Sequence, residues 1–186
     1  LNKLKEAENY TRKAIELNPN FATAHSNLGS ILQDLNKLKE AENYTRRAIQ
    51  LDPNFASAYS NLGSIARKLD KLKEAEIFAR KAIELNPNLA EAHSNLGCIL
   101  RELGKLKEAE LITLKAVELN PNLANAYSNL GIISYELGKL KEAEIFACKA
   151  IELNPNFAKA YYSLSKIESL NNEKNWEEYL FTQDIL

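Results

Sequence analysis

The chain has 186 residues, of which 45% are hydrophobic and 26% are charged, proportions that are typical of folded globular proteins. Its 24 basic and 25 acidic residues nearly cancel, so the chain's net charge favours neither nucleic acid phosphates nor anionic lipid. No apolar run approaches the roughly 20 residues that span a bilayer, and residues 1–20 lack the apolar stretch of a signal peptide. We therefore expect a cytoplasmic protein that binds neither nucleic acid nor membranes.

The first predicted element is an amphipathic helix over residues 1–17, which ends at Asn18-Pro19-Asn20. The same Asn/Asp-Pro-Asn tripeptide returns every 34 residues, and its prolines are Pro19, Pro53, Pro87, Pro121 and Pro155. A fixed period of this length predicts a stack of structural repeats. The predicted boundaries are 1–21 for the second helix of a truncated repeat, 22–55, 56–89, 90–123 and 124–157 for four complete repeats, and 158–186 for an incomplete repeat with a C-terminal capping helix.

Each complete repeat has the pattern of two amphipathic helices. In the first repeat, the apolar stripes run along residues 25–35 and 38–51. Between the helices stand residue types that tolerate the left-handed conformation common at helix ends, namely Asn36, Asp70, Gly104 and Gly138. After each proline stands an asparagine that we expect to cap the next helix, namely Asn20, Asn54, Asn88, Asn122 and Asn156. The sequence therefore predicts tight helical hairpins and no strands.

The two ends of the array differ. Trp176, Tyr179 and Leu180 have the spacing of a helix that would cap the last hairpin. The helix over residues 1–17 lacks the first helix of its repeat, so we expect an apolar face there that the intact protein would cover and that, in isolation, supports end-to-end self-association. Because the sequence contains no methionine, we also expect it to be part of a longer protein.

The residue patterns give no support for catalysis or for a cofactor. His25 and His93 occupy one repeat position and are interpreted as buried spacers, while Cys98 and Cys148 have neither metal-ligand nor redox spacing. No phosphate-binding loop, nucleophile elbow or metalloprotease motif occurs. The carboxylates of the second helices, such as Glu42 and Glu76, are interpreted as solvated surface. We predict no catalytic residue, no metal and no enzymatic activity in this chain.

The repeats resemble tetratricopeptide repeats. The resemblance rests on the Leu-Gly pairs beginning at Leu28, Leu62, Leu96 and Leu130, on small residues at Ala41 and Ala48 and their equivalents, and on the final prolines. It implies an all-α, right-handed α-solenoid of stacked antiparallel helix pairs. The family's aromatic position in the second helix holds Thr45, Ala79, Thr113 and Ala147, with a larger residue one position earlier.

In this family the first helices line a concave groove that binds partner polypeptides. The resemblance places small polar residues on that groove, with an asparagine before every Leu-Gly pair. The predicted partner-binding residues are Asn27, Asn61, Asn95, Asn129, Ser26, Ser60, Ser94, Ser128, Arg67, Lys68, Arg101 and Tyr135. An asparagine amide can donate to a peptide carbonyl and accept from a peptide N–H. The series resembles the asparagine ladder of the O-GlcNAc transferase superhelix. The alternative is that each asparagine contacts the neighbouring repeat.

The leading hypothesis is therefore a protein-interaction scaffold that holds an extended or helical partner segment. A second is the substrate-docking region of a larger sulfotransferase or glycosyltransferase, because residues 175–186 resemble the segment that follows such arrays in cyanobacterial tetratricopeptide–sulfotransferase proteins. A third is a self-assembling spacer. The Asn-, Lys- and Ile-rich composition is typical of a bacterial source.

Overall fold

The computed structural model describes residues 2–171, and these residues form helices and turns only. The helices are α1 (Asn2–Leu17), α2 (Ala22–Asp34), α3 (Leu38–Leu51), α4 (Ala56–Lys68), α5 (Leu72–Leu85), α6 (Ala90–Glu102), α7 (Leu106–Leu119), α8 (Ala124–Glu136), α9 (Leu140–Leu153) and α10 (Ala158–Asn171). The all-α prediction is confirmed. The chain divides into two compact units, unit 1 from Leu1 to Pro121 and unit 2 from Asn122 to Leu186.

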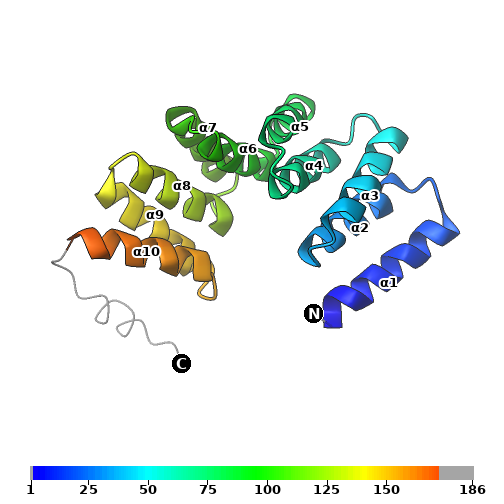
Figure 1. Ribbon diagram of the computed structural model, residues 1–186, viewed down its shortest axis with the longest axis horizontal. Coiled ribbons are helices and arrows are strands. Elements are labelled where there is room, and N and C mark those ends of the chain that lie inside the picture. Colours follow the sequence, from blue (N-terminus) through cyan, green and yellow to red (C-terminus); the bar gives the residue numbers. More distant parts are fainter. Residues whose placement is uncertain (1, 172–186) are drawn as a thin grey trace. The chain divides into compact units, whose positions relative to one another are not determined.

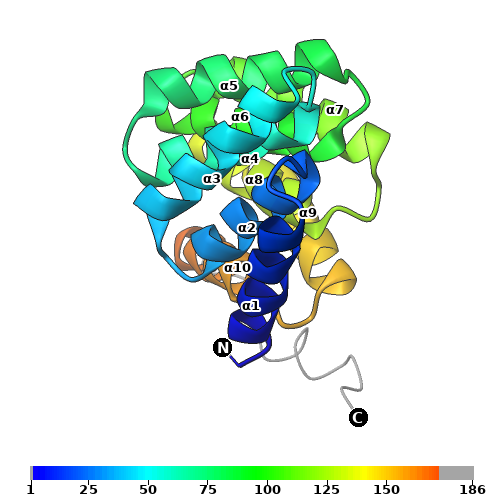
Figure 2. The same ribbon diagram turned by 90° about the vertical axis from the view of Figure 1, so that its right-hand side faces the viewer.

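In unit 1, three helical hairpins follow one another along the chain, α2 with α3, α4 with α5, and α6 with α7. Helices α1, α2 and α3 lie side by side in both views (Figures 1 and 2). Each first helix also contacts the next first helix, α2 with α4 and α4 with α6. Helix pairs are therefore stacked in unit 1, as the repeat period predicts.

The two helices of a hairpin approach closely at the Leu-Gly pair. A Cβ atom built on Gly63 would lie 3.2 Å from the carbonyl oxygen of Ala75 and 3.3 Å from the amide nitrogen of Ala79. The leucines before these glycines, such as Leu28 and Leu62, are completely or almost completely buried. Glycine at this position thus lets large leucines and small alanines fill the hairpin core.

The turns inside the hairpins use the left-handed conformation that the sequence predicts. Asn36 and Asp70 have φ of 60° and 62°, and Gly104 and Gly138 have φ of 75° and 78°. The amide of Lys37 then donates to the carbonyl of Leu32 at 2.8 Å, which closes the end of α2. The first helix of each hairpin therefore ends a few residues before the second helix begins.

The predicted asparagine caps are wrong at the starts of four helices. At the start of α2, α4, α6 and α8 the cap positions are Phe21, Phe55, Leu89 and Leu123, and none has a side-chain capping hydrogen bond. The residue before the proline uses its side chain instead, because the Oδ1 atoms of Asn18 and Asp52 accept from the amides of Asn20 and Asn54. These are Asx turns that bend the chain around the proline.

Unit 2 contains one complete hairpin, α8 with α9, followed by α10, which contacts both. Its core cluster consists of Ala143, Ala147, Leu164 and Ile167, with Tyr135 packed against it. The predicted capping helix around Trp176 lies outside the described residues. Within the described part of the chain, no helix is both long and apolar enough to cross a membrane.

Candidate binding face of the first helices

The serines that precede the asparagines are buried in the first helices. Ser26, Ser60, Ser94 and Ser128 all expose less than a twentieth of their surface. A small side chain is required where two helices come close, and serine adds a hydroxyl that needs a hydrogen-bond partner when buried. In unit 1, the next repeat supplies that partner to Ser26 and Ser60.

In unit 1, each asparagine after the first donates to the serine of the preceding repeat. Asn61 Nδ2 lies 3.2 Å from Ser26 Oγ, and Asn95 Nδ2 lies 3.0 Å from Ser60 Oγ. No other hydrogen bond of these two amides occurs among the described residues, so each keeps its Oδ1 acceptor and a second N–H. The asparagine series therefore joins the repeats and still presents hydrogen-bonding groups.

The pattern ends in unit 2, where the position equivalent to Asn61 and Asn95 is Ser163. Ser163 Oγ donates to the backbone carbonyl of Lys159 within its own helix. Ser128 Oγ, which the missing asparagine would have bonded, is buried and has no hydrogen-bond partner within the described residues. The orphaned hydroxyl shows what the asparagine contributes at the junctions of unit 1.

Asn129 of unit 2 has a hydrogen-bond partner in α10. Lys159 Nζ donates to Asn129 Oδ1 at 3.1 Å. Lys159 stands at the repeat position that Glu91 occupies two repeats earlier, and Asn129 stands at the position of Asn61. The asparagine Oδ1 can therefore accept from an ammonium group that reaches it from the next first helix.

A pocket of about 310 Å³ lies between α4 and the start of α6, lined by Ser57, Ser60, Asn61, Leu89 and Glu91. Leu89 is its apolar wall, and no lysine or arginine lines it. Glu91 is exposed and has no ion pair or hydrogen bond with the described residues. The pocket is thus rich in oxygen acceptors.

Two of the three cationic residues expected on this face pair with the carboxylate of Glu102. Arg67 lies 2.8 Å from Glu102, and Arg101 lies 3.4 Å from the same carboxylate. Lys68, next along the chain, is exposed. Tyr135, predicted to meet a partner, is half-buried against the core of unit 2. The positive charge that could attract an acidic partner is therefore partly neutralised within the chain.

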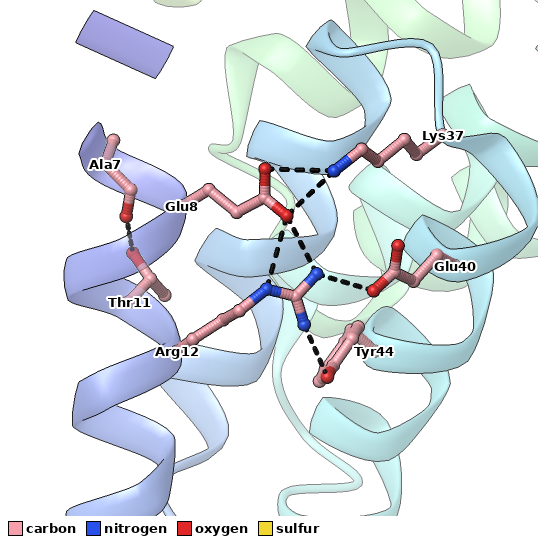
Figure 3. A network of polar contacts seen from close by, with 7 residues as sticks. All are labelled: Ala7, Glu8, Thr11, Arg12, Lys37, Glu40 and Tyr44. Atoms are coloured by element: carbon pink, nitrogen blue, oxygen red, sulfur yellow. Dashed lines mark hydrogen bonds and ion pairs between the residues drawn. The ribbon is translucent and has the colours of Figure 1, made fainter. Parts of the chain in front are cut away.

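Sequence reasoning missed a second polar system, which joins neighbouring repeats through their second helices. In Figure 3, Glu8 of α1 accepts from Arg12 and from Lys37, and Arg12 also bonds Glu40 and the Tyr44 hydroxyl. The same arrangement recurs with Glu42, Arg46, Lys71 and Glu74, and with Glu76, Arg80, Lys105 and Glu108. The signal was present, because these residues recur with the 34-residue period.

The central carboxylates of this system are not solvated surface, contrary to expectation. The side chains of Glu8, Glu42 and Glu76 are 10%, 14% and 16% exposed. Hydrogen bonds from Arg12 and Lys37 lower the pKa of Glu8. Burial raises the pKa of Glu42, but hydrogen bonds from Arg46 and Lys71 outweigh it and the net pKa is lowered. These carboxylates stay ionised and clamp one repeat to the next.

The remaining candidate groups have structural surroundings. His25 and His93 are buried as predicted, and their ring nitrogens contact the backbone carbonyls of Pro19 and Leu89. Among the described residues, no group of histidine, cysteine and acidic side chains could hold a metal ion.

Comparison with known protein families supports the repeat assignment. Models described as tetratricopeptide repeat match residues 1–21, 22–55, 56–89, 78–110 and 112–145. A comparison with curated proteins found no significant match.

Solved structures of similar chains include tetratricopeptide proteins, YrrB and TTC0263 among them. YrrB, described as having an unusual peptide-binding site, is 28% identical over 88% of this chain and 84% of its own, with a TM-score of 0.62. MamA is 26% identical over 84% of this chain and 91% of its own, with a TM-score of 0.64. TTC0263 of Thermus thermophilus, at 22% identity over 91% of this chain and 93% of its own, supports the fold with a TM-score of 0.79.

The family models cover most of the chain, the described helices are stacked in pairs, and the glycine and left-handed turn positions are occupied as the repeat requires. This repeat architecture is that of a protein-interaction scaffold. The chain belongs to the tetratricopeptide repeat family.

Proposed function

We propose that this scaffold holds an extended segment of a partner polypeptide along the first helices of unit 1, through the asparagines Asn27, Asn61 and Asn95. The observation that carries the proposal is the state of Asn61 and Asn95. Each amide is fixed by one hydrogen bond to a serine of the preceding repeat, and its Oδ1 and second N–H remain for a ligand. A side chain held in one orientation loses little entropy on binding.

The spacing of the series suits a peptide main chain. Stacked helices lie about 8–10 Å apart, whereas an extended peptide advances about 3.3 Å per residue. Successive asparagines would therefore meet about every third residue of the partner. Because an amide can both donate to and accept from a peptide group, this mode of binding places few demands on the partner's side chains. The peptide-binding site named for YrrB supports a polypeptide as the ligand.

A random library of displayed peptides, each roughly 12 residues long, tests the proposal, because the two intervals between three asparagines span only about six residues. We expect selected peptides to shift the amide signals of α2, α4 and α6 in NMR spectra. Methylation of single backbone nitrogens along such a peptide should weaken binding with a period of about three residues, because only every third residue meets an asparagine. Failure to select any binder, or binders that perturb only the second helices, would exclude this function.

A second candidate function is self-association through α1, which one observation favours. Tyr10 is 70% exposed, whereas Tyr44, at the same position of α3, stacks on His25 and contacts the Arg12 guanidinium. A second copy packing on α1 would cover Tyr10 and the exposed Leu17. Light scattering over a concentration series should reveal dimers that Tyr10→Lys removes. A monomer at every concentration would rule out this assembly.

A further inference from the structure

We infer that the pocket between α4 and α6 is a binding site for a basic side chain, lysine or arginine, of the partner polypeptide. The inference rests on the proposed function and deepens it by naming one feature of the partner's sequence. It concerns Ser57, Ser60, Asn61, Leu89 and Glu91, all within unit 1.

The groups that line the pocket are mainly hydrogen-bond acceptors. Asn61 gives one Nδ2 hydrogen to Ser26 and keeps its second N–H and its Oδ1, whose two lone pairs can accept from a cation and from a peptide N–H. Ser60 Oγ already accepts from Asn95, and Glu91 contributes a carboxylate with no partner in the described residues. Ammonium and guanidinium groups carry several N–H donors and no acceptor, so they match this set of oxygens.

In unit 2 the asparagine equivalent to Asn61 accepts from a cation of the next first helix. Lys159 Nζ donates to Asn129 Oδ1 at 3.1 Å. In unit 1, Asn61 is equivalent to Asn129 and Glu91 is equivalent to Lys159. Unit 1 therefore has two acceptors, the Asn61 Oδ1 and the Glu91 carboxylate, where unit 2 has an acceptor and a donor. A basic side chain from a partner would restore in unit 1 the contact that Lys159 makes within unit 2.

The pocket also has an apolar surface that suits the stem of a basic side chain. A lysine side chain has a hydrocarbon stem that prefers an apolar surface while its ammonium meets acceptors. Leu89 lines the pocket beside the exposed Glu91 and supplies that surface. The equivalent residues one repeat earlier are Phe55 and Ser57, so an acidic residue is missing there and the basic-side-chain site is specific to this junction.

The experiment is an NMR titration of the full chain with Nα-acetyl-lysine N-methylamide and its arginine analogue, and with the norleucine analogue as the uncharged control. The basic probes should shift the backbone amides of Asn61, Leu89 and Glu91, and the norleucine probe should not. Glu91→Gln should weaken binding of the lysine probe about three- to tenfold, the range for an exposed ion pair reinforced by hydrogen bonds. Glu91→Lys should abolish it, because its own ammonium would occupy Asn61 Oδ1 as Lys159 occupies Asn129.

Glu84→Gln is the matched control, since Glu84 is an exposed carboxylate of α5 that pairs with Lys81 outside the pocket. It makes the same change in net charge and should leave probe binding unchanged. The inference is overturned if the basic probes leave the pocket amides unmoved, if norleucine binds equally, or if Glu91→Gln has no more effect than Glu84→Gln. Single-residue probes need no partner polypeptide, so this result is independent of whether the peptide selection succeeds.

Discussion

Replacing Gly29 with alanine should destabilise the first complete hairpin, because the added methyl group would collide with Thr45 of α3. Alanine stabilises a helix interior by about 1 kcal/mol relative to glycine. Overpacking a filled interface costs about 1–3 kcal/mol. Thr45 is completely buried and its Oγ1 donates to the Ala41 carbonyl at 2.8 Å, so it has little freedom to move away. Subtracting the gain in helix propensity from the cost of the collision leaves an expected net loss of up to about 2 kcal/mol.

Thr45→Ala gives the double-mutant cycle that isolates this collision. With alanine at position 45, the hairpin would match the second repeat, where Gly63 faces Ala79 and a Cβ built on the glycine meets only atoms at 3.2 Å or beyond. Alanine at position 29 would then no longer collide with Thr45, so the double variant should be more stable than the sum of the single losses predicts, by the collision cost of about 1–3 kcal/mol. Guanidinium denaturation followed by circular dichroism gives the free energy of unfolding of the four proteins, which are compared at equal dependence of that free energy on denaturant concentration. A coupling near zero would refute the close approach at this glycine.

Three further outcomes follow from the turns and the ion pairs. The pKa values of Glu8, Glu42 and Glu76 in the folded protein lie below the unfolded value near 4.5. Their contribution to stability is therefore fully present above the unfolded pKa and is lost as the pH falls through the folded pKa values. The thermal unfolding midpoint should drop between about pH 5 and pH 3, and it should drop less steeply in the Glu42→Gln variant. Asp70→Gly should leave stability unchanged or raise it by about 0.5–1 kcal/mol, since φ is 62° there, whereas Asp70→Val should lower it. Arg80→Leu should cost about 0.5–1 kcal/mol by removing bonds to Glu76 and Glu108, and an unchanged denaturation midpoint would contradict the clamp.

The fold could be predicted well from the sequence because each boundary depends on local chemistry. Proline ends a second helix wherever it occurs, and Asn36 and Asp70 adopt the left-handed conformation that their residue types tolerate. The cap prediction failed for a local reason as well. The side chain of Asn18 accepts from the Asn20 amide in the turn, and the cap position of α2 is Phe21, so Asn20 lies in the turn one residue before the cap position.

The contacts between repeats were harder to predict, because they join residues about one repeat apart. The period aligns Asn61 with Asn95, but it does not tell that each donates to the serine 35 residues before it. Likewise, Glu42 resembles any exposed helical carboxylate until Lys71 and Arg46 are placed around it. Charged residues that recur with the repeat period are a signal for such contacts. The sequence also shows where the signal ends, because the position of Arg80 holds Leu114 and Cys148 in the next two repeats.

The most direct test of the account compares two pairs of substitutions in isothermal titration with one selected peptide. Asn61→Ala with Asn95→Ala removes both asparagine–serine hydrogen bonds and the proposed ligand contacts. Ser26→Ala with Ser60→Ala removes the same two hydrogen bonds and leaves the asparagines in place. We predict at least about a tenfold loss of affinity for the asparagine pair and a loss of about threefold or less for the serine pair. Equal affinities in the two double variants would show that the asparagines only join the repeats.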